Sequence, residues 1–122
     1  MAYYLVRARA HAEQLDALKA RLDSGEISKM RPFGSALDHS LTHARVDEDG
    51  WAVWEEEDYC RPPLDMERKA VLDDYFSDLS VRPVERGSGW KVIDHLPHLW
   101  KGEPKRLTAV DRPWSNKPRS PQ

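Results

Sequence analysis

The sequence predicts an α+β domain in which four short strands form one antiparallel sheet and two helices cover one of its faces. Two observations predict it. Stretches rich in β-branched and aromatic residues alternate with stretches in which leucine recurs at helical spacing. Glycine, proline and acidic turns separate these stretches. The 122 residues suffice for one domain with its own core, which we expect over residues 1–100.

The first half of the chain gives the clearest elements. Residues 3–9 form a β-rich run, and residues 11–24 change to helical spacing before Gly25, a residue typical of a helix C-cap. Residues 36–46 are expected to be a second strand. The turn Asp-Glu-Asp-Gly at 47–50 joins it to a third strand over residues 51–57. Leu37 and Leu41 also fit a helical period, so a helix stays open as the alternative for residues 36–46.

The second half begins with two prolines. Pro62 and Pro63 stop the third strand and open a helix over residues 64–76, because the fixed φ of proline suits a first helical turn. A short strand over residues 79–84 follows. Residues 90–100 are expected to form a short strand or helical turn that packs on the body. Proline recurs through residues 101–122, which predicts an extended, basic, proline-rich arm outside the domain.

Connection rules convert this order of elements into a sheet. The order β-α-β-β-α-β with right-handed crossovers gives a ferredoxin-like antiparallel sheet whose first and third strands are central. Central strands should be the most apolar, and the runs YYLVRA and WAVW meet this expectation. Edge strands should carry polar residues or proline. The second strand reads DHSLTHAR, and the fourth contains Pro83, which has no N–H to donate.

Alternation along the strands divides their side chains between two faces. One face is small and apolar and suits two packed helices: Tyr4, Val6, Ala8, Ala36, Ser40, Thr42, Ala44, Ala52 and Trp54. The other, the mixed face, is half apolar and half ionisable: Tyr3, Leu5, Arg7, Arg9, Leu37, His39, Leu41, His43, Trp51, Val53, Glu55 and Glu57. Such a face suits neither full exposure nor full burial. We therefore expect a second subunit to cover it and enclose a polar cavity.

This arrangement resembles the dimeric α+β barrel superfamily over about residues 3–84. The resemblance is one of architecture and includes no diagnostic motif. It implies two ferredoxin-like sheets that face each other around a pocket, in a superfamily of monooxygenases, isomerases, dehydratase-like enzymes and many members without assigned activity. It assigns no catalytic residue to this chain. The segment beyond Trp90 departs from the minimal unit, and its alternative place is over part of the mixed face.

The mixed face supplies the candidate site. Five residues are expected to bind a small, anionic molecule, with the arginines attracting its charge and the rings forming an apolar wall: Tyr3, Arg7, Arg9, Trp51 and Glu57. Three residues are candidates for proton transfer: His39, His43 and Glu55. Whether the domain turns over a substrate stays open. The alternative is a non-catalytic protein-interaction or regulatory subunit that binds a partner through the same face and the basic tail. A purely structural alternative for Arg7, Arg9, Glu55 and Glu57 is cross-strand ion pairs worth about 0.2–1 kcal/mol each.

No cofactor and no metal are expected. On a strand, His39 and His43 would lie about 13 Å apart, too far to bind one ion. On a helix, the same spacing could bring two ligands together, with a glutamate completing the site. Cys60 is expected to be a small packed side chain whose pKa the neighbouring acids raise. Asp58 is expected to cap the following turn, and Glu67 and Arg68 are expected to form local or tertiary salt bridges.

Charge and composition limit the kinds of partner that we expect. The net charge is −2; residues 101–122 hold six basic and two acidic side chains, hence +4, which leaves −6 for the rest. We expect this arm to dock on the acidic body or on a second copy in a homodimer, with nucleic-acid binding as the alternative. No apolar run approaches the roughly 20 residues of a membrane span, and the start has no signal-peptide pattern. The single cysteine suits a reducing cytoplasm.

Overall fold

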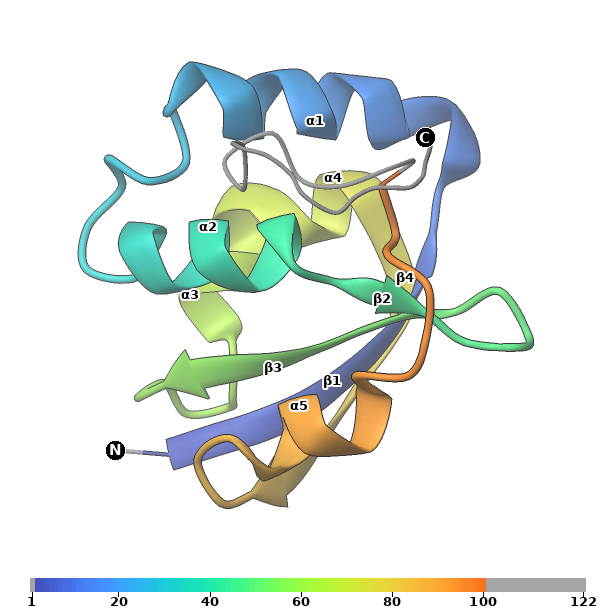
Figure 1. Ribbon diagram of the computed structural model, residues 1–122. Helices are drawn as coiled ribbons and strands as arrows, with labels where there is room; N and C mark the ends of the chain where they lie inside the picture. The colour runs from blue at the N-terminus through green and yellow to red at the C-terminus, as the bar shows by residue number, and fades with distance from the viewer. Residues whose placement is uncertain (1, 101–122) are drawn as a thin grey trace, which may run out of the picture.

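In a computed structural model of the chain, which describes residues 2–100, four antiparallel strands form one sheet in the order β2-β3-β1-β4 (Figure 1). The fold is a mixed α+β one. The strands are β1 (Ala2–Ala10), β2 (Arg45–Val46), β3 (Ala52–Asp58) and β4 (Phe76–Val84). The predicted arm, residues 101–122, lies outside the described residues, and with it the expectation of nucleic-acid binding through the arm.

Helical segments fill two of the three connections between the strands. Between β1 and β2 lie η1 (Ala12–Gln14), α1 (Leu15–Ser24) and α2 (Gly34–Thr42). Between β3 and β4 the chain is helical over α3 (Asp65–Glu67), η2 (Arg68–Leu72) and α4 (Asp73–Tyr75), which confirms the helix predicted there; η2 is one turn of π-helix. After β4 comes α5 (Ser88–Ile93). Within residues 2–100, no helix is both long and apolar enough to span a bilayer.

Strands β1 and β3 occupy the centre of the sheet, and β4 is an edge strand that contains Pro83. The predicted strands at 3–9 and 51–57 are present with nearly the expected ends. Strand β4 begins at Phe76, three residues before the predicted start, so the helix before it ends at Tyr75. Gly25 ends α1 in the left-handed conformation, with φ of 83°, as a C-cap glycine does.

The prediction of a strand over residues 36–46 was wrong for most of its length. Residues up to Thr42 are helix α2, and only Arg45–Val46 pair with β3. The reason is the burial of one side of α2, where Leu37 and Leu41, one helical turn apart, are both fully buried in the core. Consequently Leu37, His39, Leu41 and His43 do not belong to the mixed face of the sheet.

Helix α2 takes the place of an edge strand beside the last residues of β3. The Ser40 hydroxyl donates a hydrogen bond to the backbone carbonyl of Glu55 over 2.7 Å, and α2 packs against β3. A carbonyl that a neighbouring strand would otherwise pair is thereby satisfied by a side chain. The short β2 and the nearby helix are therefore compatible with a well-paired β3.

The core lies between the sheet and the helices. The helix-facing side chains of the central strands, as predicted from alternation, are fully buried: Val6, Ala8, Ala52 and Trp54. They belong to one cluster with residues of the helices: Leu18, Leu22, Leu37, Leu41, Val71 and Leu72. Each large apolar side chain buried in this way contributes about 1.5–3 kcal/mol of transfer free energy.

The opposite face of the sheet is partly covered by α5. Helix α5 packs on β3 and β1, so the chain's own residues cover part of the surface that a second subunit was expected to cover. Figure 1 shows α5 on the other side of the strands from α1. Helix α5 therefore lies over part of the mixed face, which was the alternative position for the segment beyond Trp90.

The first prediction concerns Gly34, at the start of α2. A Cβ at this position would clash with the backbone carbonyl oxygen of Ile27, which cannot move as a flexible side chain could. Gly34→Ala should therefore lower the free energy of unfolding by about 1–3 kcal/mol, measured by urea denaturation. Ser35→Ala, at an exposed neighbouring position, is the control and should change it little. Equal free energies of unfolding for the two variants would contradict the steric requirement for glycine at position 34.

Candidate functional site

Two adjoining hollows lie where α2 meets the end of β3. The larger, the outer groove, has a volume of about 450 Å³ and is lined by Tyr3, His39, Glu55, Arg86 and Trp90 together with the shared wall. The smaller, the acid–thiol pocket, has a volume of about 260 Å³ and is lined by Phe33, Asp58, Tyr59, Cys60, Met66 and Glu67 with the same wall. The shared wall consists of Ser35, Ala36 and Glu57.

The outer groove collects half of the site residues predicted from the sequence. Tyr3, His39, Glu55 and Glu57 all line it, although His39 comes from α2 and not from a strand. The Trp90 ring on α5 lies edge-on to the His39 imidazole, with centroids 6.1 Å apart. A mixed set of aromatic, basic and acidic side chains thus meets at one surface.

The Glu55 carboxylate is hydrogen-bonded to the start of α5 and is therefore not a free general acid or base. Its Oε2 accepts the backbone N–H of Gly87 (2.9 Å), and its Oε1 accepts those of Gly89 (2.8 Å) and Trp90 (3.2 Å). These N–H groups have no partner within the helix, and the helix dipole favours a carboxylate there. The side chain is 5% exposed. Its contacts give Glu55 a structural task, the attachment of α5 to the sheet.

His43 supports His39 and does not line the groove. Its Nδ1–H donates to the backbone carbonyl of His39 over 2.8 Å, and the two rings lie 4.5 Å apart. A carbonyl is only an acceptor, so the bond fixes the proton on Nδ1 of His43. The helical spacing brings these histidines together, as the helical alternative had implied.

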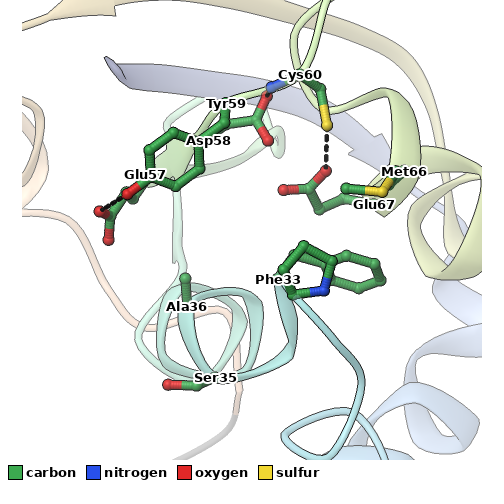
Figure 2. A pocket seen from close by; sticks show the side chains of 10 residues that line it. Phe33, Ser35, Ala36, Glu57, Asp58, Tyr59, Cys60, Met66 and Glu67 are labelled. Atoms are coloured by element: carbon green, nitrogen blue, oxygen red, sulfur yellow. Dashed lines mark hydrogen bonds between the residues drawn. The ribbon is translucent and has the colours of Figure 1, made fainter. Parts of the chain in front are cut away.

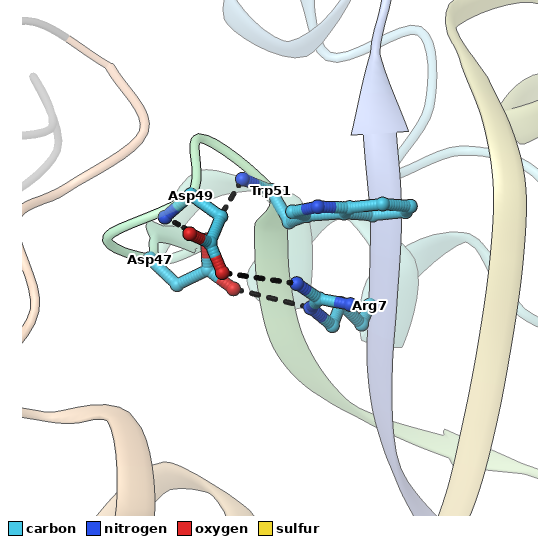
Figure 3. Close-up of polar contacts among 4 residues, drawn as sticks. All are labelled: Arg7, Asp47, Asp49 and Trp51. Atoms are coloured by element: carbon cyan, nitrogen blue, oxygen red, sulfur yellow. Dashed lines mark hydrogen bonds and ion pairs between the residues drawn. The ribbon is translucent and has the colours of Figure 1, made fainter.

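Arg7, Arg9 and Trp51 lie together elsewhere on the same face of the sheet. Figure 3 shows Arg7 beside the Trp51 ring and the two aspartates of the β2–β3 turn. The Arg7 and Arg9 guanidinium carbons lie 4.2 Å and 4.3 Å from the Trp51 ring centroid. Their Nε–H groups point to Asp47 (3.1 Å) and to Asp78 (3.3 Å, a weaker contact).

Within residues 2–100, the expected ion pairs of these arginines with Glu55 and Glu57 are not formed, and the arginines pair with aspartates. Because aspartates meet both arginines, neither presents an uncompensated charge to an anion. Burial tends to raise the pKa of Asp47, yet the N–H of Trp51 and the Arg7 guanidinium lower it overall.

The acid–thiol pocket contains three side chains whose ligand atoms converge. One carboxylate oxygen each of Asp58 and Glu67 and the Cys60 sulfur all lie within 4.8 Å of one another. Figure 2 shows them at one end of the pocket, with the Cys60 thiol directed at Glu67 over 3.8 Å. Asp58 and Glu67 are 3% and 1% exposed. Among residues 2–100, these three side chains form the group of acidic, thiol or imidazole ligands that could hold a metal ion. Neither His39 nor His43 belongs to it.

Asp58 holds the loop that forms this pocket. Its Oδ2 accepts the backbone N–H groups of Cys60 (3.1 Å) and Leu64 (2.6 Å), which confirms the predicted cap. Leu64 is fully buried and has φ of 64°, a left-handed conformation that costs of order 1–3 kcal/mol for a residue with a side chain. The hydrogen bond to Asp58 helps to offset that cost.

Burial and mutual repulsion shift the ionisation of the pocket. Burial, together with the hydrogen bond to Asp58, raises the pKa of Glu67 from 4.5 to about 7. Burial also tends to raise the pKa of Asp58, but the Leu64 N–H and the bond from Glu67 lower it overall. Of the two acids, Glu67 therefore has the higher pKa. The predicted salt bridge is present for Arg68, whose Nε lies 3.3 Å from Asp73 Oδ1. For Glu67 the prediction was wrong, because its neighbours are another acid and a thiol.

The pKa values of Glu56 and Cys60, near the pocket, are raised as well. Burial first, and then repulsion by Glu67, raises the pKa of Glu56 well above its usual value, while the Trp54 indole N–H donates to Glu56 over 3.0 Å. The Met66 N–H tends to lower the pKa of Cys60, but burial and the two acids raise it overall. The sequence had predicted this direction for Cys60.

Among the residues that were not predicted as site residues, two buried acids left a signal in the sequence. Glu56 alternates with Trp54 on the helix-facing side of β3, so a charge falls at a core position. Glu67 lies three residues after Leu64 and four before Val71, on the apolar stripe of its helix. Arg86 left no signal, because nothing in a loop sequence tells which side chain borders a groove.

No family model, no curated protein and no solved structure matches this chain.

The second prediction is a pH dependence that arises from Glu67. The folded-state pKa of about 7 exceeds the unfolded value, so the folded chain binds more protons between about pH 4.5 and pH 7. The stability contributed by neutral Glu67 is fully present below that window and is lost as the pH rises through about 7. The slope is at most about 1.4 kcal/mol per pH unit for one group.

Glu67→Gln should flatten this part of the stability curve, measured by urea denaturation from pH 5 to pH 8. Glu13→Gln, at an exposed position, is the control and should leave the slope as it is. Unchanged slopes in both variants would show that Glu67 ionises normally in the folded chain.

Proposed function

We propose that this domain binds a small anionic molecule in the outer groove, with its negative group on Arg86 and its apolar part against Trp90 and Tyr3. The observation that carries the proposal is an exposed arginine at the rim of a groove walled by two aromatic side chains. The volume of about 450 Å³ lies within the roughly 300–1,000 Å³ typical of small-molecule sites.

Charge compensation distinguishes Arg86 from the arginines predicted to bind the anion. Arg7 and Arg9 have aspartate partners, whereas no ion pair of Arg86 occurs within residues 2–100. A guanidinium without a carboxylate partner is a favourable place for a carboxylate or phosphate, which it binds with two parallel hydrogen bonds. Glu57, the acid in the shared wall, already accepts a hydrogen bond from the Tyr59 hydroxyl over 3.0 Å.

Any proton transfer to the bound molecule falls to His39. Of the three predicted proton-transfer residues, Glu55 accepts hydrogen bonds from the start of α5, and His43 does not line the groove. His39 is exposed at the groove, and an imidazole changes charge near physiological pH. The proposal concerns binding, and His39 is the residue through which a reaction would be tested.

The third prediction tests the anion site with 3-phenylpropanoate, which carries one carboxylate and one ring. We expect it to bind and to shift NMR signals of the Trp90 indole. Arg86→Gln should weaken binding about tenfold or more, since a hydrogen bond to a charged group contributes about 1.5–3 kcal/mol. Arg82→Gln, a neighbouring exposed arginine that does not line the groove, should bind as the parent does.

The matched cation 2-phenylethylamine should bind more weakly than 3-phenylpropanoate. Stronger binding of the amine would mean that Glu57 dominates the groove and would overturn the proposal. Equal losses in Arg86→Gln and Arg82→Gln would reduce the effect to general electrostatic attraction.

We also propose that the sheet is ferredoxin-like and that the chain forms a homodimer. The strand order β2-β3-β1-β4, with β1 and β3 central, supports the first part, whereas α2 and α5 are additions to the minimal unit. Because α5 lies on β3 and β1, a facing sheet would meet mainly the remaining surface of β1 and β4.

The fourth prediction is therefore a solution mass of two chains, measured by light scattering on the full chain. A monomer would overturn the dimer and the barrel arrangement. It would leave the groove unaffected, since all the described residues that line it come from one chain.

A further inference from the structure

The acid–thiol pocket has a feature that the anion proposal does not use. Asp58, Cys60 and Glu67 come from the end of β3, the following loop and α3, and they place two oxygens and one sulfur together. One of these groups is also incompletely satisfied. Glu67 Oε2 is buried and has no hydrogen-bond donor, while Glu67 Oε1 faces the Cys60 sulfur.

We propose that Asp58, Cys60 and Glu67 bind one zinc ion at the floor of the acid–thiol pocket. This inference goes beyond the proposed anion site and does not depend on it. Zinc is borderline soft and accepts thiolate and carboxylate ligands together, at about 2.3 Å and about 2.0–2.2 Å. In a tetrahedral site these lengths place sulfur and oxygen about 3.6 Å apart. The Cys60 sulfur and Glu67 Oε1 are 3.8 Å apart.

The surroundings of the three ligands suit a cation. Asp58 is oriented by two backbone N–H groups that both use Oδ2, which leaves Oδ1 for an ion. Hydrogen bonds of this kind orient metal-binding carboxylates. Glu56, two residues before Asp58 on β3, adds a further fully buried carboxyl group. A divalent cation would relieve the repulsion among these acids and give Glu67 Oε2 a partner.

Three protein ligands leave one position of a tetrahedral ion open to the pocket. Structural zinc sites have four protein ligands, whereas sites that bind an exchangeable molecule have three. The rim beside this position includes two side chains with exposed apolar surface, Tyr59 at 68% and Met66 at 40%. A ligand of the zinc ion would therefore combine one metal-binding atom with an apolar part.

The test uses the full chain and zinc alone, titrated by calorimetry, with cobalt as a spectroscopic substitute. We expect one zinc ion per chain and, with cobalt, a sulfur-to-metal charge-transfer absorption. Magnesium, which prefers six oxygen ligands, should not compete. Cys60→Ala should abolish the charge-transfer absorption. Cys60→Ala and Glu67→Gln should each weaken zinc binding by at least about tenfold, the loss typical of removing even an outer partner of a metal site.

Two control variants separate this site from nearby alternatives. Glu57→Gln removes a carboxylate from the same pocket that is not among the three ligands, and it should bind zinc as the parent does. Equal weakening in Glu57→Gln and Glu67→Gln would reduce binding to general attraction and overturn the proposal. His39→Ala tests the adjacent histidine pair. Loss of zinc in His39→Ala with retention in Cys60→Ala would assign the ion to the histidines and also overturn it.

Failure of the zinc proposal is distinguishable from failure of the anion proposal. Zinc binding depends on Cys60 and Glu67, and 3-phenylpropanoate binding depends on Arg86. A chain that binds no zinc by calorimetry and gives no cobalt–sulfur absorption would refute the zinc site, whatever its affinity for the anion.

Discussion

The last four residues of β3 are all acids, and the fold depends on how each carboxyl group is compensated once it leaves water. Residues 55–58 alternate between the two sides of the sheet, and three of the four are nearly or fully buried. A buried charge without a partner costs several kcal/mol, so a strand with this sequence is stable only if its neighbours supply donors or protons.

Each acid meets that requirement in a different way. Glu55 accepts three N–H groups at the start of α5 and thereby attaches that helix to the sheet. Glu56 accepts the Trp54 indole N–H, and its raised pKa favours the neutral form. Glu57 accepts the Tyr59 hydroxyl, and Asp58 accepts two N–H groups of the loop that follows. The position of α5 and the shape of the 59–64 loop both follow from these contacts.

The strands and the side-chain alternation could be predicted because they depend on local sequence pattern. Tyr3 and Glu57 were placed correctly on the sheet surface, and Trp54 correctly in the core. The segment around Leu37 and Leu41 could not be decided, because apolar residues four apart satisfy both a helical period and a strand period. Its helical state follows from burial beneath the sheet, and burial is a property of the whole fold.

The candidate site was less predictable for a related reason. The groove joins residues from β1, α2, β3 and the turn before α5, and sequence alternation orders residues only within a sheet. The prediction that Arg7 and Arg9 bind the anion overlooked Asp47 and Asp78, which lie in a turn and in the edge strand. The charge of an arginine is therefore no guide to a ligand until its neighbours are known.

Glu57 lies between the two proposed sites. It stands in the wall between the outer groove and the acid–thiol pocket, with an anion proposed on one side and a cation on the other. A cation beside Asp58 and Glu67 would offset the negative potential that the acids at the end of β3 impose on the groove. It would thereby favour an anion at Arg86, and by thermodynamic reciprocity the anion would favour the cation equally. The acidic end of β3 would then act as a single electrostatic unit, in which the same carboxyl groups shape the fold and connect the two proposed binding sites.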